Sequence, residues 1–215
     1  DFFQTILFHF LEKKIYNDYL FKMNEYEIDI NDYKRIKPIG QGAFGKVYLV
    51  ENTKTNKEYA AKIIKTEYDL EEEEEEEIDK SLLLNEFITH KSMNNPAILK
   101  IIGYCYNDFS MRNHLTMILE YMPNSSLDKV LKNLRKGITP KGWTTTKSYI
   151  NLLGIAIGMK YLHLQKTVQR DLKPGNILLD INYYPKISDF GFSKKLDELN
   201  SKKVITTKRI GTPIY

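Results

Sequence analysis

Three glycines near the start of the chain have the spacing of a loop that closes over phosphate groups. They lie in the run Gly40-Gln41-Gly42-Ala43-Phe44-Gly45, and the backbone N–H groups of such a run can cradle an anion. A dinucleotide-binding fold would need a helix directly after the run. Here β-prone residues follow, from Lys46 to Val50. The run therefore predicts a flap between two antiparallel strands, not the turn of a dinucleotide site.

A cation and a carboxylate follow where a phosphate flap would need them. Lys62 ends the β-prone run Tyr59-Ala60-Ala61-Lys62 on the next predicted strand. Glu86 lies within a segment of helical spacing and is the candidate that holds the lysine in position. Either residue alone would indicate only a solvated surface group, so this interpretation depends on the other motifs.

Oxygen ligands for a hard cation stand later in the sequence. Asp171 and Asn176 flank the Lys173-Pro174 turn, and Asp189 stands at the end of a predicted strand, followed by Phe190 and Gly191. An aspartate can accept a hydroxyl proton, and amide and carboxylate oxygens are the ligands that Mg²⁺ prefers. Together with the flap and the lysine, these residues predict a magnesium–nucleotide site.

The elements that must position these residues come in the order strands first, helices later, which is typical of an α+β chain. Strands are predicted over residues 33–39, 47–50, 57–64, 97–104, 115–120, 177–179 and 186–188, and helices over 82–93, 127–134 and 145–164. The last helix places Ile150, Leu153, Ile157 and Tyr161 on one apolar face.

Two segments outside this pattern have their own character. Residues 1–31 predict an amphipathic helical extension, since apolar residues recur at helical spacing from Phe3 to Ile15. The run Glu71–Glu77 predicts a solvated insertion over residues 67–79, because like charges in sequence repel one another.

Jointly the motifs resemble those of a eukaryotic-type protein kinase domain. The resemblance covers residues 33–215 and rests on the segments Gly40–Val47, Ala60–Lys62, Asp171–Asn176, Asp189–Gly191 and Gly211–Tyr215. It implies a two-lobed fold, with an antiparallel sheet and one helix in an N-lobe of residues 32–122 and a mostly helical C-lobe of residues 123–215. The hinge between the lobes would be residues 120–122.

The resemblance implies catalytic and metal-binding roles for the matching residues. Asp171 would orient the substrate hydroxyl and accept its proton, and Lys173 would help to neutralise the γ-phosphoryl group. Asn176 and Asp189 would hold Mg²⁺. Catalysis by such a site consists mainly of positioning and charge neutralisation.

ATP would be bound by residues of both lobes. Lys62, held by Glu86, would contact the α- and β-phosphates. Leu119 would be the gatekeeper residue before the hinge, while Val47, Ala60 and Leu178 would enclose the adenine. The resemblance gives the full set of further nucleotide contacts as Ile39, Gly40, Gln41, Gly42, Ala43, Phe44, Gly45, Val47, Ala60, Leu119, Glu120, Met122, Ser126 and Leu178.

The substrate class follows in part from Lys173. A lysine two residues after the catalytic aspartate resembles the pattern of the serine/threonine branch of the family. Thr212 before Pro213 resembles the same branch. The run from Leu119 to Leu127 resembles the tyrosine-kinase-like group, whose members often phosphorylate Ser or Thr. The expected partners are thus ATP and protein substrates with Ser or Thr hydroxyls.

Two departures from the family pattern stand out. Gln169 occupies the position before Arg170 where the family usually has His, which predicts weaker packing against Phe190 and retained chemistry. The sequence also ends at Tyr215, before the family's APE motif. We expect a truncated form that lacks the later C-lobe helices and most of the substrate-docking surface, and that is inactive if the lobe does not fold.

Residues 192–210 correspond to the activation segment of the family. Thr206 and Thr207 lie among basic residues there. A phosphate on either threonine could pair with Arg170 and order the segment, whereas a solvated threonine is the alternative.

Composition narrows the function classes further. With 42% hydrophobic residues and one cysteine, Cys105, a disordered chain, a disulfide framework and a thiolate zinc site are excluded. The net charge is +4, but the basic residues are scattered along the sequence, which argues against nucleic-acid binding. No run reaches the length of a membrane span. A cytoplasmic protein is expected, and its oligomeric state stays open.

Two other functions remain compatible with these residues. A pseudokinase would bind nucleotide or act as a scaffold without turnover, as Gln169 and the end at Tyr215 allow. A pure interaction fragment would use residues 1–31 and the glutamate run as docking elements. Magnesium-dependent ATP binding would distinguish the interaction fragment from the active kinase and the pseudokinase. Turnover would distinguish the active kinase from the pseudokinase.

Overall fold

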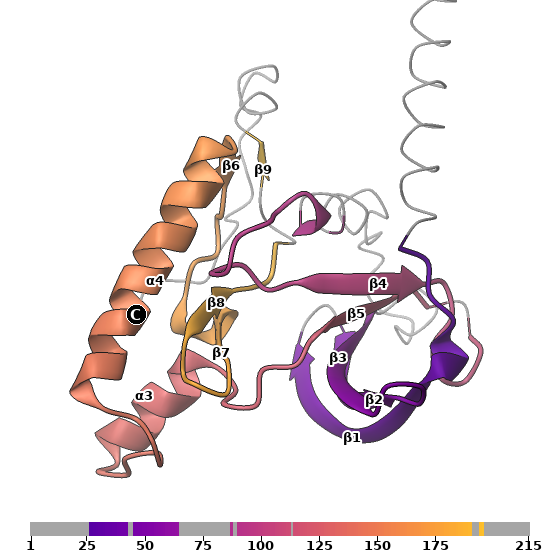
Figure 1. The fold of residues 1–215 in the computed structure, drawn as a ribbon, viewed down its shortest axis with the longest axis horizontal. Coiled ribbons are helices and arrows are strands. Elements are labelled where there is room, and N and C mark those ends of the chain that lie inside the picture. The colour runs from indigo at the N-terminus through magenta and orange to yellow at the C-terminus, as the bar shows by residue number, and fades with distance from the viewer. Residues whose placement is uncertain are drawn as a thin grey trace, which may run out of the picture. The chain divides into compact units, whose positions relative to one another are not determined.

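The computed structural model describes residues 26–42, 45–64, 87, 90–112, 114–190 and 194–195. These residues belong to two compact units. The first is drawn from Asp1–Lys65 and Ile102–Leu119, and the second from Thr66–Ile101 and Glu120–Tyr215. The labelled elements of both units are drawn in Figure 1.

A five-stranded sheet makes up most of the first unit (Figure 1). Its strands, in spatial order, are β1 (Tyr33–Gly42), β2 (Gly45–Asn52), β3 (Lys57–Ile64), β5 (Thr116–Glu120) and β4 (Ile101–Cys105). The pairs β1–β2 and β2–β3 are antiparallel. A short 3₁₀ turn, η1 (Ile30–Asp32), precedes β1. The predicted α+β class, with an antiparallel sheet ahead of the helical part, is confirmed.

One face of this sheet carries the core of the first unit. Tyr33, Val50, Ala61 and Ile118 are buried in one cluster. Val50 and Ala61 come from neighbouring antiparallel strands, and their side chains share a face because strand side chains alternate. Residues two positions along the same strands also lie on this face, whereas Val47 and Lys62 lie on the other one.

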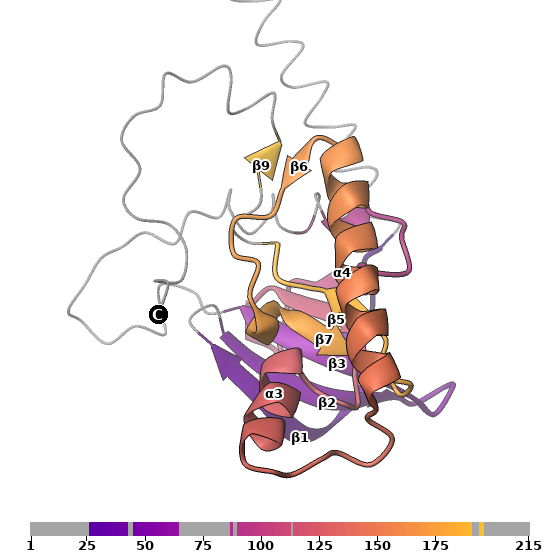
Figure 2. The same cartoon turned by 90° about the vertical axis from the view of Figure 1, so that its left-hand side faces the viewer.

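The second unit combines two helices with short strands. Its elements are α3 (Leu127–Arg135), α4 (Thr145–Leu164), β6 (Thr167–Val168), η3 (Pro174–Asn176), β7 (Ile177–Leu179), β8 (Pro185–Ile187) and β9 (Lys194–Lys195). β7 pairs with β8 and β6 with β9, both antiparallel, and α3 lies beside β7 (Figure 2). The main apolar cluster contains Ile98, Leu162, Ile177, Ile187 and Phe190.

The strand predicted over residues 97–104 is only partly correct. β4 begins at Ile101, and the preceding residues pair with β8 instead. Leu99 N–H donates to the Ile187 carbonyl, and Ile187 N–H donates to the Ala97 carbonyl. Residues 97–99 are apolar because they pack into the second unit, a tertiary contact that β-propensity does not reveal.

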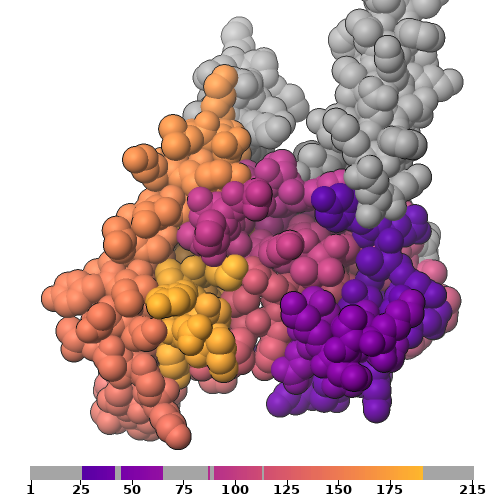
Figure 3. Space-filling view, in the orientation of Figure 1, coloured from indigo at the N-terminus to yellow at the C-terminus, as the bar shows by residue number. Residues whose placement is uncertain are grey.

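The helix predicted over 145–164 is found as α4, but its buried face differs from the prediction. Leu153 is 63% and Ile157 50% exposed, whereas Gly158 and Leu162 are buried. Glycines set the buried face: a Cβ on Gly154 would lie 2.6 Å from Pro185 Cγ. Large apolar side chains of α4, such as Leu152 and Leu164, are therefore exposed. Figure 3 shows α4, in orange, at the surface of the second unit. Among the described residues no helix, α4 included, combines the length and apolar character of a membrane span.

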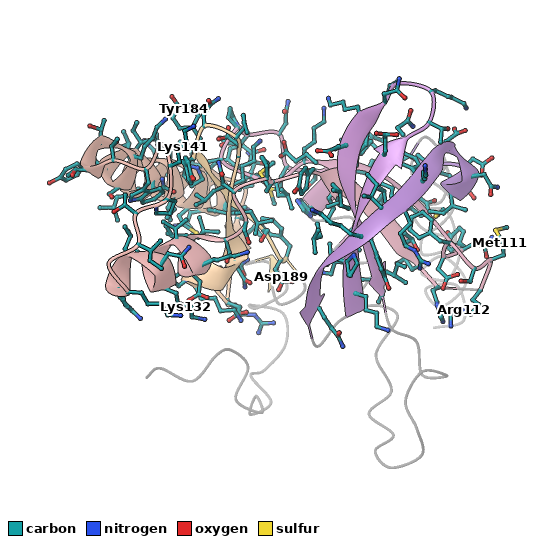
Figure 4. All side chains as sticks on the ribbon, turned by 90° about the horizontal axis from the view of Figure 1, so that it is seen from below. Met111, Arg112, Lys132, Lys141, Tyr184 and Asp189 are labelled. Atoms are coloured by element: carbon teal, nitrogen blue, oxygen red, sulfur yellow. The ribbon has the colours of Figure 1, made fainter. Side chains whose placement is uncertain are left out.

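A buried carboxylate organises the loop between β4 and β5. Asp108 is 1% exposed and accepts hydrogen bonds from the N–H groups of Ser110 (2.7 Å) and Arg112 (3.1 Å). The Arg112 side chain and His114 Nδ1 lie within 3.0 Å of its other oxygen. Figure 4 shows Arg112 at the outer end of this loop. Burial alone would raise the pKa of Asp108, but these hydrogen bonds together lower it.

The lowered pKa predicts an acid-sensitive contribution to stability. Because the folded pKa lies below the unfolded value of about 4, the contribution is present above pH 4 and is lost as the pH falls through the folded pKa. Asp108→Asn should therefore cost about 1–3 kcal/mol at neutral pH. It should also flatten the loss of stability with acid, measured by urea unfolding from pH 7 to pH 2. Asp128→Asn, at a more exposed carboxylate, is the control, and an equal effect of the two substitutions would contradict the prediction.

Candidate functional site

The glycine run forms the β1–β2 hairpin, as predicted. In the antiparallel register Gly40 stands opposite Val47, and Gly42 opposite Gly45. Gly45 has a φ of 140°, and a Cβ there would collide with the Ile63 carbonyl oxygen of β3. Only glycine fits this position, since the backbone of β3 lies directly against it. Ala43 and Phe44 lie outside the described residues.

The sheet places three predicted nucleotide-binding residues of the first unit on one face. Val47 pairs directly with Lys62 in the β2–β3 register, so their side chains project from the same side of the sheet. Ala60 lies two residues before Lys62 on β3 and shares that side. Ala60 and Leu119 are buried, whereas Ile39 is 40% exposed. The face thus carries the Lys62 cation near the glycine hairpin.

The second unit brings two further predicted residues together. Ser126 and Leu178 form an isolated antiparallel bridge, supported by the bond from Leu179 N–H to the Ser125 carbonyl (2.8 Å). Met122 is buried nearby in sequence. The side chain of Glu120 accepts hydrogen bonds from the Lys100 N–H (2.6 Å) and from Lys186 Nζ (2.8 Å).

Asp171 lies at the centre of the predicted catalytic loop. Asp171 is only 6% exposed, and its Oδ2 accepts hydrogen bonds from Lys173 Nζ (2.6 Å) and Asn176 Nδ2 (3.0 Å). Asn176 Nδ2 also donates to the Asp171 carbonyl (2.9 Å). The 3₁₀ turn η3, begun by Pro174, folds the chain back so that these side chains meet. The carboxylate is therefore held in one orientation, as a proton acceptor requires, and a cation lies beside it.

Asp189 follows the buried Ser188, which comes directly after the strand β8. Its φ is 60°, in the left-handed region, which is uncommon for non-glycine residues although aspartate adopts it more readily than most. Figure 4 shows Asp189 on the side of the second unit away from Lys141 and Tyr184. The neighbouring Phe190 is 1% exposed, and the His90 ring lies 4.7 Å from its ring.

Gln169 makes the hydrogen bonds that the sequence predicts it can retain. Its Nε2 donates to the carbonyls of Asp189 (2.7 Å) and Ser188 (3.2 Å), and its Oε1 accepts from the Asp171 N–H (3.1 Å). Phe190 packs in an apolar cluster with Leu162 and Ile187. The predicted weakening of its packing by Gln169 stays a prediction.

The donor set fits a magnesium ion. Asn176 turns its Nδ2 toward Asp171, so its Oδ1 points away from Asp171. Asn176 Oδ1 and the Asp189 carboxylate are both oxygen donors, the kind that Mg²⁺ takes. These two residues are linked through Ser188, which precedes Asp189 and donates twice to the Asn176 carbonyl. They would hold the ion.

Sequence analysis missed Ser188 and Lys186 as parts of this site. Ser188 is buried, and its hydroxyl donates to the Asn176 carbonyl (2.9 Å). A hydroxyl directly before Asp189, after the apolar strand β8, was the available signal. Lys186 gave no such signal, because its pairing with Glu120 joins residues distant in sequence.

Several predictions fall outside the described residues. These are Glu86 and most of the helix predicted over 82–93, the extension up to residue 25, the insertion 67–79, Gly191, the activation segment with Thr206 and Thr207 apart from β9, and Gly211–Tyr215. The roles implied for them stay predictions. Residues 26–29 of the predicted helical extension are described and do not form a helix.

Comparison with known proteins adds independent findings. The family model described as "Protein kinase domain" matches residues 33–215. The chain is 33% identical over 188 residues to the "cAMP-dependent protein kinase catalytic subunit" of Dictyostelium discoideum, covering 86% of this chain and 26% of that protein. It is 31% identical to the "Probable serine/threonine-protein kinase PBL7" of Arabidopsis thaliana, covering 91% and 48%.

A third relative is the "Cysteine-rich receptor-like protein kinase 10" of Oryza sativa subsp. japonica, 34% identical over 86% of this chain and 26% of the relative. The chain therefore spans between about a quarter and about half of the length of these curated relatives.

Proposed function

Since the chain belongs to the protein kinase domain family, we propose that it transfers the γ-phosphate of Mg·ATP to Ser or Thr hydroxyls of protein substrates. The observation that carries the proposal is the buried Asp171 carboxylate, which is held by both Lys173 and Asn176. A carboxylate fixed in one orientation suits the acceptance of a hydroxyl proton, and the lysine beside it can offset charge on the group that is transferred.

Each side chain has one proposed task. Asp171 orients the substrate hydroxyl and takes its proton as the new O–P bond forms and the bond to the leaving ADP breaks. Lys62 holds the phosphates, and Lys173 offsets charge on the transferred group. Bound Mg²⁺, held by Asn176 and Asp189, would supply charge neutralisation at the phosphate oxygens.

The glycine hairpin and the adenine-binding residues complete the proposal. Backbone N–H groups between Gly40 and Gly45 cover the phosphates. Val47, Ala60 and Leu178 enclose the adenine, and residues 120–122 hydrogen-bond it through their main chain. Within the first unit, the pairing of Val47 with Lys62 supports the placement of Val47 beside the phosphate-binding lysine.

Specificity for Ser or Thr is supported by Lys173 and by relatives named as serine/threonine kinases. The run from Leu119 to Leu127 supports placement in the tyrosine-kinase-like group. We further propose that the protein acts in the cytoplasm. The chain spans only part of the length of these relatives. That the whole molecule acts on protein substrates is therefore also a proposal.

The test is phosphoamino-acid analysis. The full-length protein is incubated with Mg²⁺, γ-labelled ATP and a mixed peptide substrate that contains Ser, Thr and Tyr. Label on phosphoserine and phosphothreonine is expected. Label on phosphotyrosine alone would overturn the specificity, and nucleotide binding without any transfer would replace the proposal with the pseudokinase function.

A further inference from the structure

We propose that the exposed cations of α3 bind acidic residues of the protein substrate, so that the protein phosphorylates Ser or Thr within acidic sequences. These cations form the α3 basic surface, which consists of Lys129, Lys132, Arg135 and Lys136. The inference rests on the proposed function, because it names the class of substrate for that reaction.

The part of the chain that contains α3 is poor in carboxylates. Residues 129–170 include nine Lys or Arg and no Asp or Glu. The acids that bound this stretch are Asp128 and Asp171, and the second of these belongs to the proposed catalytic loop. Cations that are scattered over the whole sequence therefore dominate this stretch, and a surface formed from it attracts anionic partners.

Helical spacing gathers four of these cations on one side of α3. Lys129, Lys132 and Lys136 follow one another at intervals of three and four residues, which are neighbours on the surface of a helix. Arg135 lies three residues after Lys132, and all four residues are exposed. Val130, which is 3% exposed, lies in the apolar cluster that holds the opposite side. The helix thus packs by its apolar side and presents its charged side to solvent.

Most of the charge of the α3 basic surface is not offset by neighbouring acids. Asp128, the only acid of α3, pairs with Lys132 at 2.8 Å. In the part of the chain that the structure describes, no carboxylate pairs with Lys129, Arg135 or Lys136. The helix also contains no aromatic residue on which a nucleic-acid base could stack. Acidic side chains of a protein therefore fit this surface better than a single-stranded nucleic acid does.

The place of α3 in the second unit favours a substrate over other acidic partners. The helix contacts the 3₁₀ turn η3, which ends at Asn176 in the proposed catalytic loop. Figure 4 shows Lys132 on the same side of the second unit as Asp189, away from Lys141. An extended peptide advances about 3.3 Å per residue. A few residues of a peptide that presents its hydroxyl to Asp171 therefore suffice to reach α3.

The first test compares two peptides that differ only in charge. One has a serine flanked on both sides by glutamates, and the other has glutamine at the same positions. With the full-length protein and Mg·ATP, the KM of the acidic peptide should be about tenfold lower, because several weak exposed ion pairs act together. The kcat should differ little, and the KM of the acidic peptide should rise with salt. Equal KM values for the two peptides would overturn the proposal.

The second test removes two cations of the α3 basic surface. Lys129→Gln/Lys136→Gln should raise the KM of the acidic peptide about fivefold and leave that of the glutamine peptide unchanged. Lys141→Gln/Lys147→Gln is the control with equal loss of charge, since Lys141 lies on the other side of the unit and Lys147 lies over the Tyr184 ring. An equal rise in the control would show that only net charge matters, and would overturn the proposal.

A reversal of charge gives a gain that misfolding cannot produce. Lys129→Glu/Lys136→Glu should prefer a peptide with lysine flanks to the acidic peptide, since opposite charges now meet. A folded variant that still prefers the acidic peptide would refute the proposal. Higher activity of Lys129→Gln/Lys136→Gln on the glutamine peptide would assign the surface to the chain's own run Glu71–Glu77 and would also overturn it.

Peptide binding without ATP gives a readout that does not depend on transfer. Fluorescence anisotropy of the labelled acidic peptide should show binding that Lys129→Gln/Lys136→Gln weakens about fivefold. A single-stranded oligonucleotide that binds more tightly than the peptide, and is weakened by the same substitutions, would replace the protein partner and overturn the proposal. If the wild-type protein transferred no phosphate, the proposed function would fail, yet the binding result would still decide what the α3 basic surface binds.

Discussion

Asp171→Asn is expected to lower kcat by about 10²- to 10⁴-fold, with little change in the KM for ATP. Asparagine has the same shape, but it cannot accept the proton of the substrate hydroxyl. Asp171 Oδ2 also accepts from Lys173 and Asn176, so the substitution disturbs the loop that presents the group. Steady-state transfer of labelled phosphate to a peptide measures the effect.

The control for Asp171→Asn is Asp128→Asn, which removes a half-exposed carboxylate on α3. The control should leave kcat unchanged. Both variants should unfold at nearly the temperature of the wild-type protein. A folded Asp171→Asn protein that kept more than a tenth of wild-type kcat would exclude Asp171 as the proton acceptor.

Lys62→Met is expected to lower kcat/KM for ATP by about 10²-fold or more, in the range seen when a charge-stabilising donor is removed. Lys62 stands opposite Val47 on the sheet face beside the glycine hairpin. Methionine keeps most of the apolar stem and removes the charge. The phosphates would then lose the cation that the proposal assigns to the first unit.

A matched substitution on the same strand separates this effect from sheet stability. Lys57 lies at the other end of β3 and is exposed. Lys57→Met should change kcat/KM less than twofold, measured over a range of ATP concentrations. Equal losses in the two variants would show that the sheet, and not the charge of Lys62, is responsible.

Much of the fold could be predicted from local signals. The strands at 57–64 and 177–179 and the helix at 145–164 are found with the predicted bounds, because their periodicity and flanking turn residues agree. The pairing of residues 97–99 with β8 could not be predicted, since it depends on a tertiary contact. The buried face of α4 was also misjudged. Gly154 and Gly158 approach β8 closely, and hydrophobic spacing gives no weight to glycine.

The candidate site likewise has one part that could be predicted from the sequence and another that could not. The residue types and spacing of Asp171 and Asn176 sufficed to predict that they meet, because a proline-containing turn joins them. The link from Gln169 to Asp189 could not be predicted in detail, since it needs a left-handed backbone at Asp189. The sequence identified Gln169 as a departure that keeps its hydrogen bonds, but not the three main-chain groups that it joins.

The central claim is that the protein transfers phosphate with the help of a metal ion held by Asn176 and Asp189. The most direct test follows labelled γ-phosphate from ATP to a Ser/Thr peptide, with full-length wild-type protein and Asp189→Asn, while Mg²⁺ is titrated. We predict Mg²⁺-dependent transfer by the wild-type protein and a loss of at least 10²-fold in the variant, which should remain folded. Transfer by Asp189→Asn at the wild-type rate and with the same Mg²⁺ dependence would contradict the account.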